Sequence, residues 1–206
     1  MGIDIENPGT DAPALKGALR SLVGGWIQLD SGIIGSPQLF IDLDLPEDYI
    51  AFKISCVGIL SDNNNYPAYA LSVDGGATYI NDTDDMVEAY KFYSEYHNGG
   101  ASAPDIEDST NGVGMLTSLW VNTGERYAVD IQIDPGAADK RPRVSSFLTI
   151  TNANLGFARV QSMPSANDPI GRVNAIRLGS ANAMNLGAPA TVNLIGGAYT
   201  LLGMLA

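Results

Sequence analysis

The chain has 206 residues, enough for one sizeable all-β domain, and its 11 Lys and Arg residues against 23 Asp and Glu residues give a formal net charge of -12. Such a charge repels phosphate backbones and anionic lipid headgroups, which argues against nucleic acid as a partner and against membrane insertion. Cys56 is the only cysteine, so an intrachain disulfide and a zinc site made of several cysteines are excluded.

The first 25 residues differ from the rest of the chain. In "DAPALKGALRSLVGG", Leu15, Leu19 and Leu22 fall on one side of two expected helical turns, and two glycines end them. We expect residues 1–25 to be an arm outside the main domain. The opening "MGIDIENPGTDAP" carries acids where a secretory signal carries bases and lacks an apolar core, which predicts synthesis in the cytoplasm without a signal peptide.

Alternation of apolar and polar residues recurs along most of the remaining chain, and no long window sustains a helical apolar stripe. In "FKISC", for example, Phe52, Ile54 and Cys56 point one way and Lys53 and Ser55 the other. The pattern predicts an all-β fold, an antiparallel two-sheet sandwich over residues 26–197. Strands are expected near 26–30, 38–43, 50–60, 68–73, 78–81, 87–96, 116–122, 127–133, 144–151, 158–161, 173–179 and 191–195.

The apolar phases of these strands predict the core, and the segments between them predict the turns. Asp74-Gly75-Gly76 should close a tight hairpin, because these residues tolerate positive φ. The stretch "HNGGASAPDIEDSTNGVG", residues 97–114, is predicted to be a long polar loop. Side chains expected in the core are Phe52, Ile54, Leu71, Trp120, Ile131, Ile176 and Leu194.

The search for reactive groups predicts no catalytic residue, no metal site and no cofactor. His97 is the only histidine and stands in no metal-binding or nucleophile motif, and Cys56 lies among apolar neighbours as a small hydrophobe. An acidic loop leaves calcium as an alternative, although it does not match the EF-hand pattern. Its carboxylates belong to Asp82, Asp84, Asp85 and Glu88.

Aromatic residues offer a second alternative. Several rings must fall on outer faces or loops, where rings beside amides suit sugar binding, although core and cross-strand packing is the commoner use. The rings considered are those of Tyr66, Tyr69, Tyr79, Tyr90, Tyr93, Tyr96 and Trp120.

Three segments resemble a family of phage virion proteins with a jelly-roll-like sandwich, of the tail-fibre, spike or decoration type. They are "AYALSVDGGATYI" with the following "EAYKFYSEY", then "ERYAVDIQIDPGAADKRPRVSSFLTITN", and finally "VNAIRL", "SANAMNLG" and "TVNLIGG" near the end. The resemblance covers about residues 26–197. It departs where the family usually closes with Leu-Tyr-Gly, because this chain has Leu194-Ile195-Gly196 and then continues to Ala206.

The resemblance implies a non-enzymatic structural protein of a bacteriophage virion, a surface-exposed module that assembles with copies of itself and other virion proteins. Host-surface glycan is a candidate ligand. The alternative is a polysaccharide-degrading enzyme or esterase of a phage tail, which would show facing carboxylates in a groove. The expected location is the virion, after synthesis in the host cytoplasm.

The two chain ends lie outside the resemblance and are apolar for free termini. We expect residues 198–206 to be a C-terminal extension and the sandwich to fold without either end. The apolar side chains of the ends are predicted to pack against another subunit or a neighbouring virion protein. These assembly residues are Leu15, Leu19, Leu22, Leu201, Leu202 and Met204.

Overall fold

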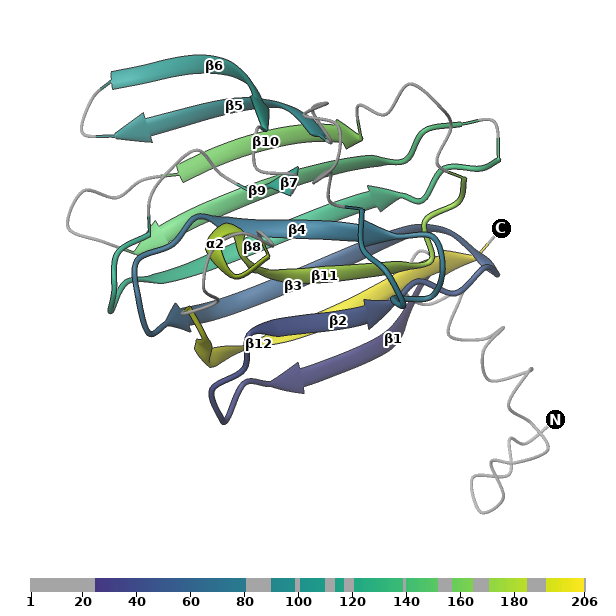
Figure 1. Cartoon of the computed structure of the whole chain (residues 1–206), viewed down its shortest axis with the longest axis horizontal. Coiled ribbons are helices and arrows are strands. Elements are labelled where there is room, and N and C mark those ends of the chain that lie inside the picture. Colours follow the sequence, from purple (N-terminus) through teal and green to yellow (C-terminus); the bar gives the residue numbers. More distant parts are fainter. Residues whose placement is uncertain are drawn as a thin grey trace, which may run out of the picture.

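A computed structural model describes residues 25–80, 90–98, 101–109, 114–116, 121–138, 140–151, 157–164, 171–184 and 192–205. Strands in these residues form two antiparallel sheets that face each other (Figure 1). The predicted all-β, two-sheet antiparallel sandwich is therefore confirmed.

The larger sheet has eight strands and the smaller has four. In spatial order, the larger sheet contains β1 (Trp26–Ile33), β12 (Leu194–Leu205), β3 (Tyr49–Ser61), β8 (Arg126–Asp134), β9 (Arg143–Thr151), β10 (Phe157–Pro164), β5 (Tyr90–Asn98) and β6 (Ala101–Ser109). The smaller contains β2 (Phe40–Asp44), β11 (Ala175–Ser180), β4 (Pro67–Ser72) and β7 (Gly114–Met115), and the short helix α2 (Ala181–Met184) follows β11.

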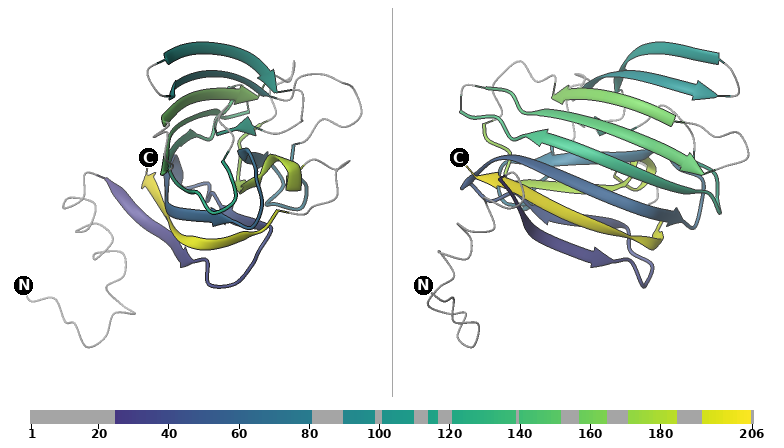
Figure 2. Two further views of the ribbon diagram at one scale, coloured as in Figure 1. Left: turned by 90° about the vertical axis from the view of Figure 1, so that its left-hand side faces the viewer. Right: turned by 180° about the vertical axis from the view of Figure 1, so that it is seen from behind.

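Strand pairing is nested, with early strands paired to late ones. Strand β1 pairs with β12, β2 with β11, β3 with β8 and β4 with β7, all antiparallel. These eight strands divide into the sets β1-β12-β3-β8 and β2-β11-β4-β7, which is the arrangement of a jelly roll. The pairs β5–β6 and β9–β10 are additions that extend the larger sheet beyond β8, and Figure 2 shows this extension from two sides.

The core lies between the two sheets and follows from the alternation in each strand. In β8, Tyr127, Val129, Ile131 and Ile133 are buried, whereas the residues between them are exposed or half-buried. Each such side chain contributes roughly 1.5–3 kcal/mol on burial. Six of the seven predicted core residues are buried, as expected: Phe52, Ile54, Leu71, Ile131, Ile176 and Leu194. The seventh, Trp120, lies outside the described residues.

The predicted C-terminal boundary is wrong. Residues 198–205 continue β12, which lies between β1 and β3 and is hydrogen-bonded to both. The register shifts between Leu194 and Gly196 and again between Gly196 and Ala198, so two glycines that resemble a strand end are irregularities within one strand. The sandwich therefore extends to Leu205 and is not complete at 197. The predicted arm, with Leu15, Leu19 and Leu22, lies outside the described residues.

The predicted polar loop 97–114 is also wrong over most of its length. Residues 101–109 form β6, which pairs with β5 in a register that runs from Asn98↔Ala101 to Tyr90↔Ser109. Backbone groups of β5 supply hydrogen-bond partners whatever the neighbouring side chains are, so a polar segment without apolar alternation still becomes a strand.

The Asp74-Gly75-Gly76 turn has the predicted conformation, with φ of 73° at Gly75 and 83° at Gly76. The Asp74 carboxylate accepts hydrogen bonds from the backbone N–H of Thr78 at 2.9 Å, from its hydroxyl at 2.5 Å and from the Ser72 hydroxyl at 2.7 Å. The strand expected at 78–81 does not form in its described part, residues 78–80, where Ile80 N–H donates to the Leu71 carbonyl at 2.7 Å.

The turn predicts a pH-dependent contribution to stability. Hydrogen bonds from Thr78, and then from Ser72, lower the pKa of Asp74 from 3.8 to about 2. Because the folded pKa is the lower one, the stabilisation is present above the unfolded pKa and is lost as the pH falls through the folded pKa. We expect Asp74→Asn to lower the urea midpoint at pH 6, and the difference from wild type to shrink between pH 4 and pH 2. A difference that is constant over this range would contradict the expectation.

Candidate binding site on the outer face of the larger sheet

Four adjacent strands of the larger sheet, β12, β3, β8 and β9, carry polar side chains on the face that points away from the core. Antiparallel registers align these side chains in rows across the strands. One row is Thr200, Ser55, Asp130 and Phe147, and the next is Leu202, Lys53, Gln132 and Ser145. Alternation thus builds a polar surface from segments that are distant in the sequence.

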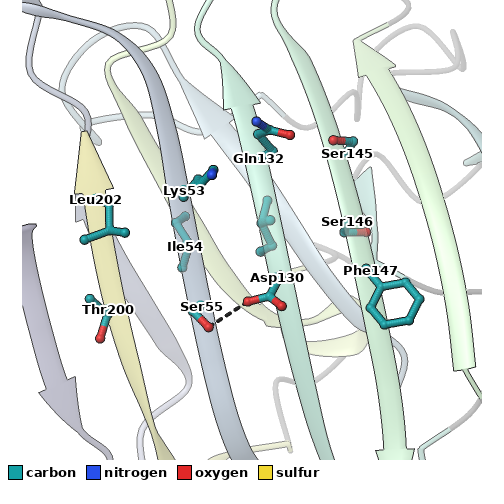
Figure 3. A pocket seen from close by; sticks show the side chains of 11 residues that line it. Lys53, Ile54, Ser55, Asp130, Gln132, Ser145, Ser146, Phe147, Thr200 and Leu202 are labelled. Atoms are coloured by element: carbon teal, nitrogen blue, oxygen red, sulfur yellow. Dashed lines mark hydrogen bonds between the residues drawn. The ribbon is translucent and has the colours of Figure 1, made fainter. Parts of the chain in front are cut away.

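A pocket of about 690 Å³ lies over these two rows, and we call it the outer-face pocket (Figure 3). Its volume is within the range of small-molecule sites. The side chains of both rows line it together with Ile54, Ile131 and Ser146.

Two contacts hold polar groups of the pocket in place. The Ser55 hydroxyl donates a hydrogen bond to Asp130 Oδ1 at 2.7 Å, which joins β3 to β8. The Lys53 ammonium lies 4.3 Å from the ring centroid of Trp26, in cation–π geometry. The Phe147 side chain is 46% exposed, an unusual exposure for a ring of this size on a sheet face. The pocket therefore combines a partly exposed ring with polar groups, of which Ser55, Asp130 and Lys53 are held by these contacts.

Among its described lining residues the pocket has one carboxylate, that of Asp130. Glycosidases use two carboxyl groups on either side of the bond. Cys56, on the inner face of β3, is buried, and burial followed by the charge of Asp130 raises the pKa of its thiol to about 12. The thiol is therefore protonated at neutral pH, as expected of a small core hydrophobe.

The structure describes few of the groups that the sequence analysis considered for metal binding or catalysis. No group of three or more His, Cys, Asp or Glu side chains that could hold a metal ion occurs among the described residues. The acidic loop from Asp82 to Glu88 lies outside them, so the calcium alternative stays a hypothesis. The backbone of His97 belongs to β5, and the structure describes nothing of its side chain.

The tyrosines proposed for sugar binding whose side chains the structure describes do not line the outer-face pocket. Tyr69 is buried in the core, and Tyr66 and Tyr79 pack against the cluster of Ala68, Ala70, Ala181 and Met184. The side chains of Tyr90, Tyr93, Tyr96 and Trp120 are outside the described part of the chain. The ring that lines the pocket is that of Phe147, a residue that the sequence-based hypothesis of sugar binding did not include.

The described residues that were predicted to take part in assembly lie on the two opposite faces of β12. Leu201 is 1% exposed and belongs to the chain's own core, so its assignment to an assembly surface is wrong. Leu202 and Met204 are half-buried, Leu202 lines the outer-face pocket, and Met204 is in register with Trp26.

A second polar cluster lies on the smaller sheet. The Arg177 guanidinium lies 4.3 Å from the Phe40 ring and 4.1 Å from the Tyr79 ring, and its Nε and Nη2 donate to the two Asp42 carboxylate oxygens at 2.7 and 2.8 Å. The guanidinium of Arg177 is thus already bound by two aromatic rings and by the carboxylate of Asp42. The cluster joins β2 to β11 and is structural.

Fold and pocket together define a jelly-roll sandwich with an open, ligand-sized site on its larger sheet. Neither the family models nor the curated proteins compared with the chain give a match. Among the described residues, no helix has the length and apolar character needed to cross a membrane.

Proposed function

We propose that this chain is a non-enzymatic structural module of a bacteriophage virion and that its outer-face pocket binds glycan of the host surface. Two features support the virion assignment. The jelly-roll order of the strands is common among viral capsid and lectin domains. The three segments that resemble phage virion proteins include the turn after β4, the β8–β9 pair and the strands β11 and β12.

The observation that carries the glycan assignment is the exposed Phe147 ring beside aligned polar side chains. A pyranose ring presents C–H groups on its faces and hydroxyl groups around its edge. An aromatic face packs against the C–H groups, while a carboxylate, an amide and an ammonium group bond the hydroxyls. Phe147, Asp130, Gln132 and Lys53 supply these groups within one pocket.

The alternative enzymatic function finds less support. A glycoside hydrolase would need a second carboxylate opposite Asp130, and the described residues that line the pocket provide none. An esterase would need an activated nucleophile. The Ser55 hydroxyl donates to a carboxylate, and the part of the pocket lining that the structure describes has no imidazole.

The proposal is tested on a glycan array with full-length protein, followed by titration of the best ligand. We expect Phe147→Ala to weaken that affinity roughly tenfold, because a lost aromatic contact costs about 0.5–1.5 kcal/mol beyond its buried area. Asp130→Asn should weaken it by a similar factor. Val57→Ala is the matched control, since Val57 is exposed on β3 but does not line the pocket.

Three results would contradict parts of the proposal. Absence of binding to any glycan would contradict the proposal that the ligand is a glycan. Equal effects of Phe147→Ala and Val57→Ala on affinity would contradict the proposal that the ligand binds in the outer-face pocket. Release of new reducing ends from a bound polysaccharide replaces the binding function by the enzymatic alternative. Labelled antibody against the protein, imaged on phage particles, tests the virion assignment separately.

A further inference from the structure

The ends of the two sheets differ in how well they resist pairing with another strand. An edge strand presents unpaired N–H and C=O groups, and proteins protect such edges with short strands, proline or charged residues. Among the described strands, the larger sheet ends at β1 and β6, and the smaller ends at β2 and β7.

Three of these four edges carry protective features. Strand β6 has a proline and three acidic residues in its sequence, "ASAPDIEDS". Strand β2 has five residues, of which two are aspartates, and β7 has only two residues. Addition of a further strand to any of them would bring charges together or form few hydrogen bonds.

Strand β1 has eight residues, "WIQLDSGI", and one charge. That charge, on Asp30, lies at the bulge between Gln28 and Asp30, where its Oδ1 accepts a hydrogen bond from Ser31 N–H at 2.7 Å and its Oδ2 accepts one from the Tyr199 hydroxyl at 3.4 Å. Ile33, the last residue of the strand, is 84% exposed, the largest exposure among the large hydrophobic side chains described. The edge of β1 thus combines length, low charge and exposed apolar surface.

The outer face of β1 is self-complementary. Its register with β12 places Trp26, Gln28, Ser31 and Ile33 on the same face as Met204, Leu202, Thr200 and Ala198. Read in either direction, this face runs apolar, polar, polar, apolar. A second β1 placed antiparallel would therefore set Trp26 against Ile33, Gln28 against Ser31 and, at the bulge, Leu29 against Asp30.

We propose that a second copy of this chain pairs with the edge of β1, antiparallel and about a two-fold axis. The bulge lies at the centre of the strand, so the pairing consists of residues 26–28 against 31–33 of the other copy, and the reverse. The contact covers Ile33 with Trp26 of the partner subunit. Protection of the other three edges explains why β1 is the edge that is used.

The pairing has a consequence for the outer-face pocket. A two-fold axis through two edge-paired antiparallel strands is perpendicular to the sheet, so the larger sheets of both copies become continuous and their pockets open on the same side. Two pockets on one side let a single dimer engage a repeating surface glycan twice, which raises its avidity. The dimer itself does not depend on glycan binding, so either proposal stands if the other fails.

Sedimentation and light scattering of the full-length protein test the pairing. We expect a mass of 43.4 kDa, twice the 21.7 kDa of one chain. Ile33→Asp should raise the dimer dissociation constant at least tenfold, since it places a charge in the apolar contact with Trp26 of the partner subunit. Val57→Asp is the matched control, with the same change at a 62% exposed residue of β3, an interior strand, and should leave the dimer intact.

A cross-linking experiment tests the register independently of stability. Chains with Trp26→Cys and chains with Ile33→Cys are mixed and treated with a short bismaleimide, while the buried Cys56 stays unreactive. The mixture should give more cross-linked dimer than either variant alone. A monomer at all concentrations, a different oligomer, or a dimer that survives Ile33→Asp and shows no preferred 26–33 cross-link would overturn the proposal.

Discussion

A chain shortened to end at Ala198 should fail to fold. The deletion removes most of β12, which forms backbone pairs with β1 on one side and β3 on the other. Among the described strands β1 pairs with β12 alone, so it would lose its place in the sheet, and the core would lose Leu201. We expect no cooperative thermal transition by circular dichroism and exposed apolar surface by dye binding. A shortened chain with a near-native melting temperature would contradict the position of β12.

Two neighbouring substitutions separate the loss of core packing from the loss of the chain end itself. Leu201 is buried on the inner face, and Leu202 is half-buried on the outer face of the same strand. Leu201→Ala should cost about 2–5 kcal/mol of unfolding free energy, as for other buried leucines. Leu202→Ala should cost clearly less, because part of its surface already contacts water. Equal costs would mean that the face assignment of β12 is wrong.

Alternation was sufficient to predict the strands that bury one face. In β3, Phe52, Ile54 and Cys56 are buried and Lys53 is exposed, as the pattern predicts. The same reasoning fails where other forces position the backbone. Strand β6 has few apolar residues, and its pairing with β5 is set by backbone hydrogen bonds.

The sequence "HNGG" before β6 is typical of a hairpin turn. The prediction of a loop followed instead from the polar composition of the residues after it. The continuation of β12 was missed for a related reason. Two consecutive glycines usually mark the end of a strand, but here each accompanies a register shift.

The outer-face pocket could be predicted only in part. Alternation shows that Ser55 and Asp130 point away from the core, but these residues are 75 positions apart and no local pattern makes their strands neighbours. The nested pairing of the jelly roll supplies that information, because it places β3 between β12 and β8. A site made of two outward-facing side chains from each of four strands has no contiguous sequence motif.

The two consecutive glycines in β12 should respond very differently to alanine. Gly197 has a φ of 121°, where side chains other than glycine are strained, and a Cβ there would lie 2.6 Å from Ile59 Cδ1 and 2.9 Å from Ile59 Cα. Ile59 is buried and cannot move away without disturbing β3. Backbone strain of about 1–3 kcal/mol and overpacking of about 1–3 kcal/mol together predict a cost of roughly 2–6 kcal/mol for Gly197→Ala.

Gly196→Ala is the control, one residue earlier in the strand. A Cβ at Gly196 would meet the nearest atoms, Leu60 Cβ and Arg126 Nη1, at 3.7 and 3.9 Å, which are ordinary contact distances. Its expected effect is within about 1 kcal/mol, because a smaller unfolded-state entropy offsets any local cost. Urea unfolding at constant m-value measures both variants, since a shift of the midpoint then reports stability alone. Equal midpoints would contradict the positive φ of Gly197 and its close contact with Ile59. The pairing of β12 with β3 at this bulge would then be wrong.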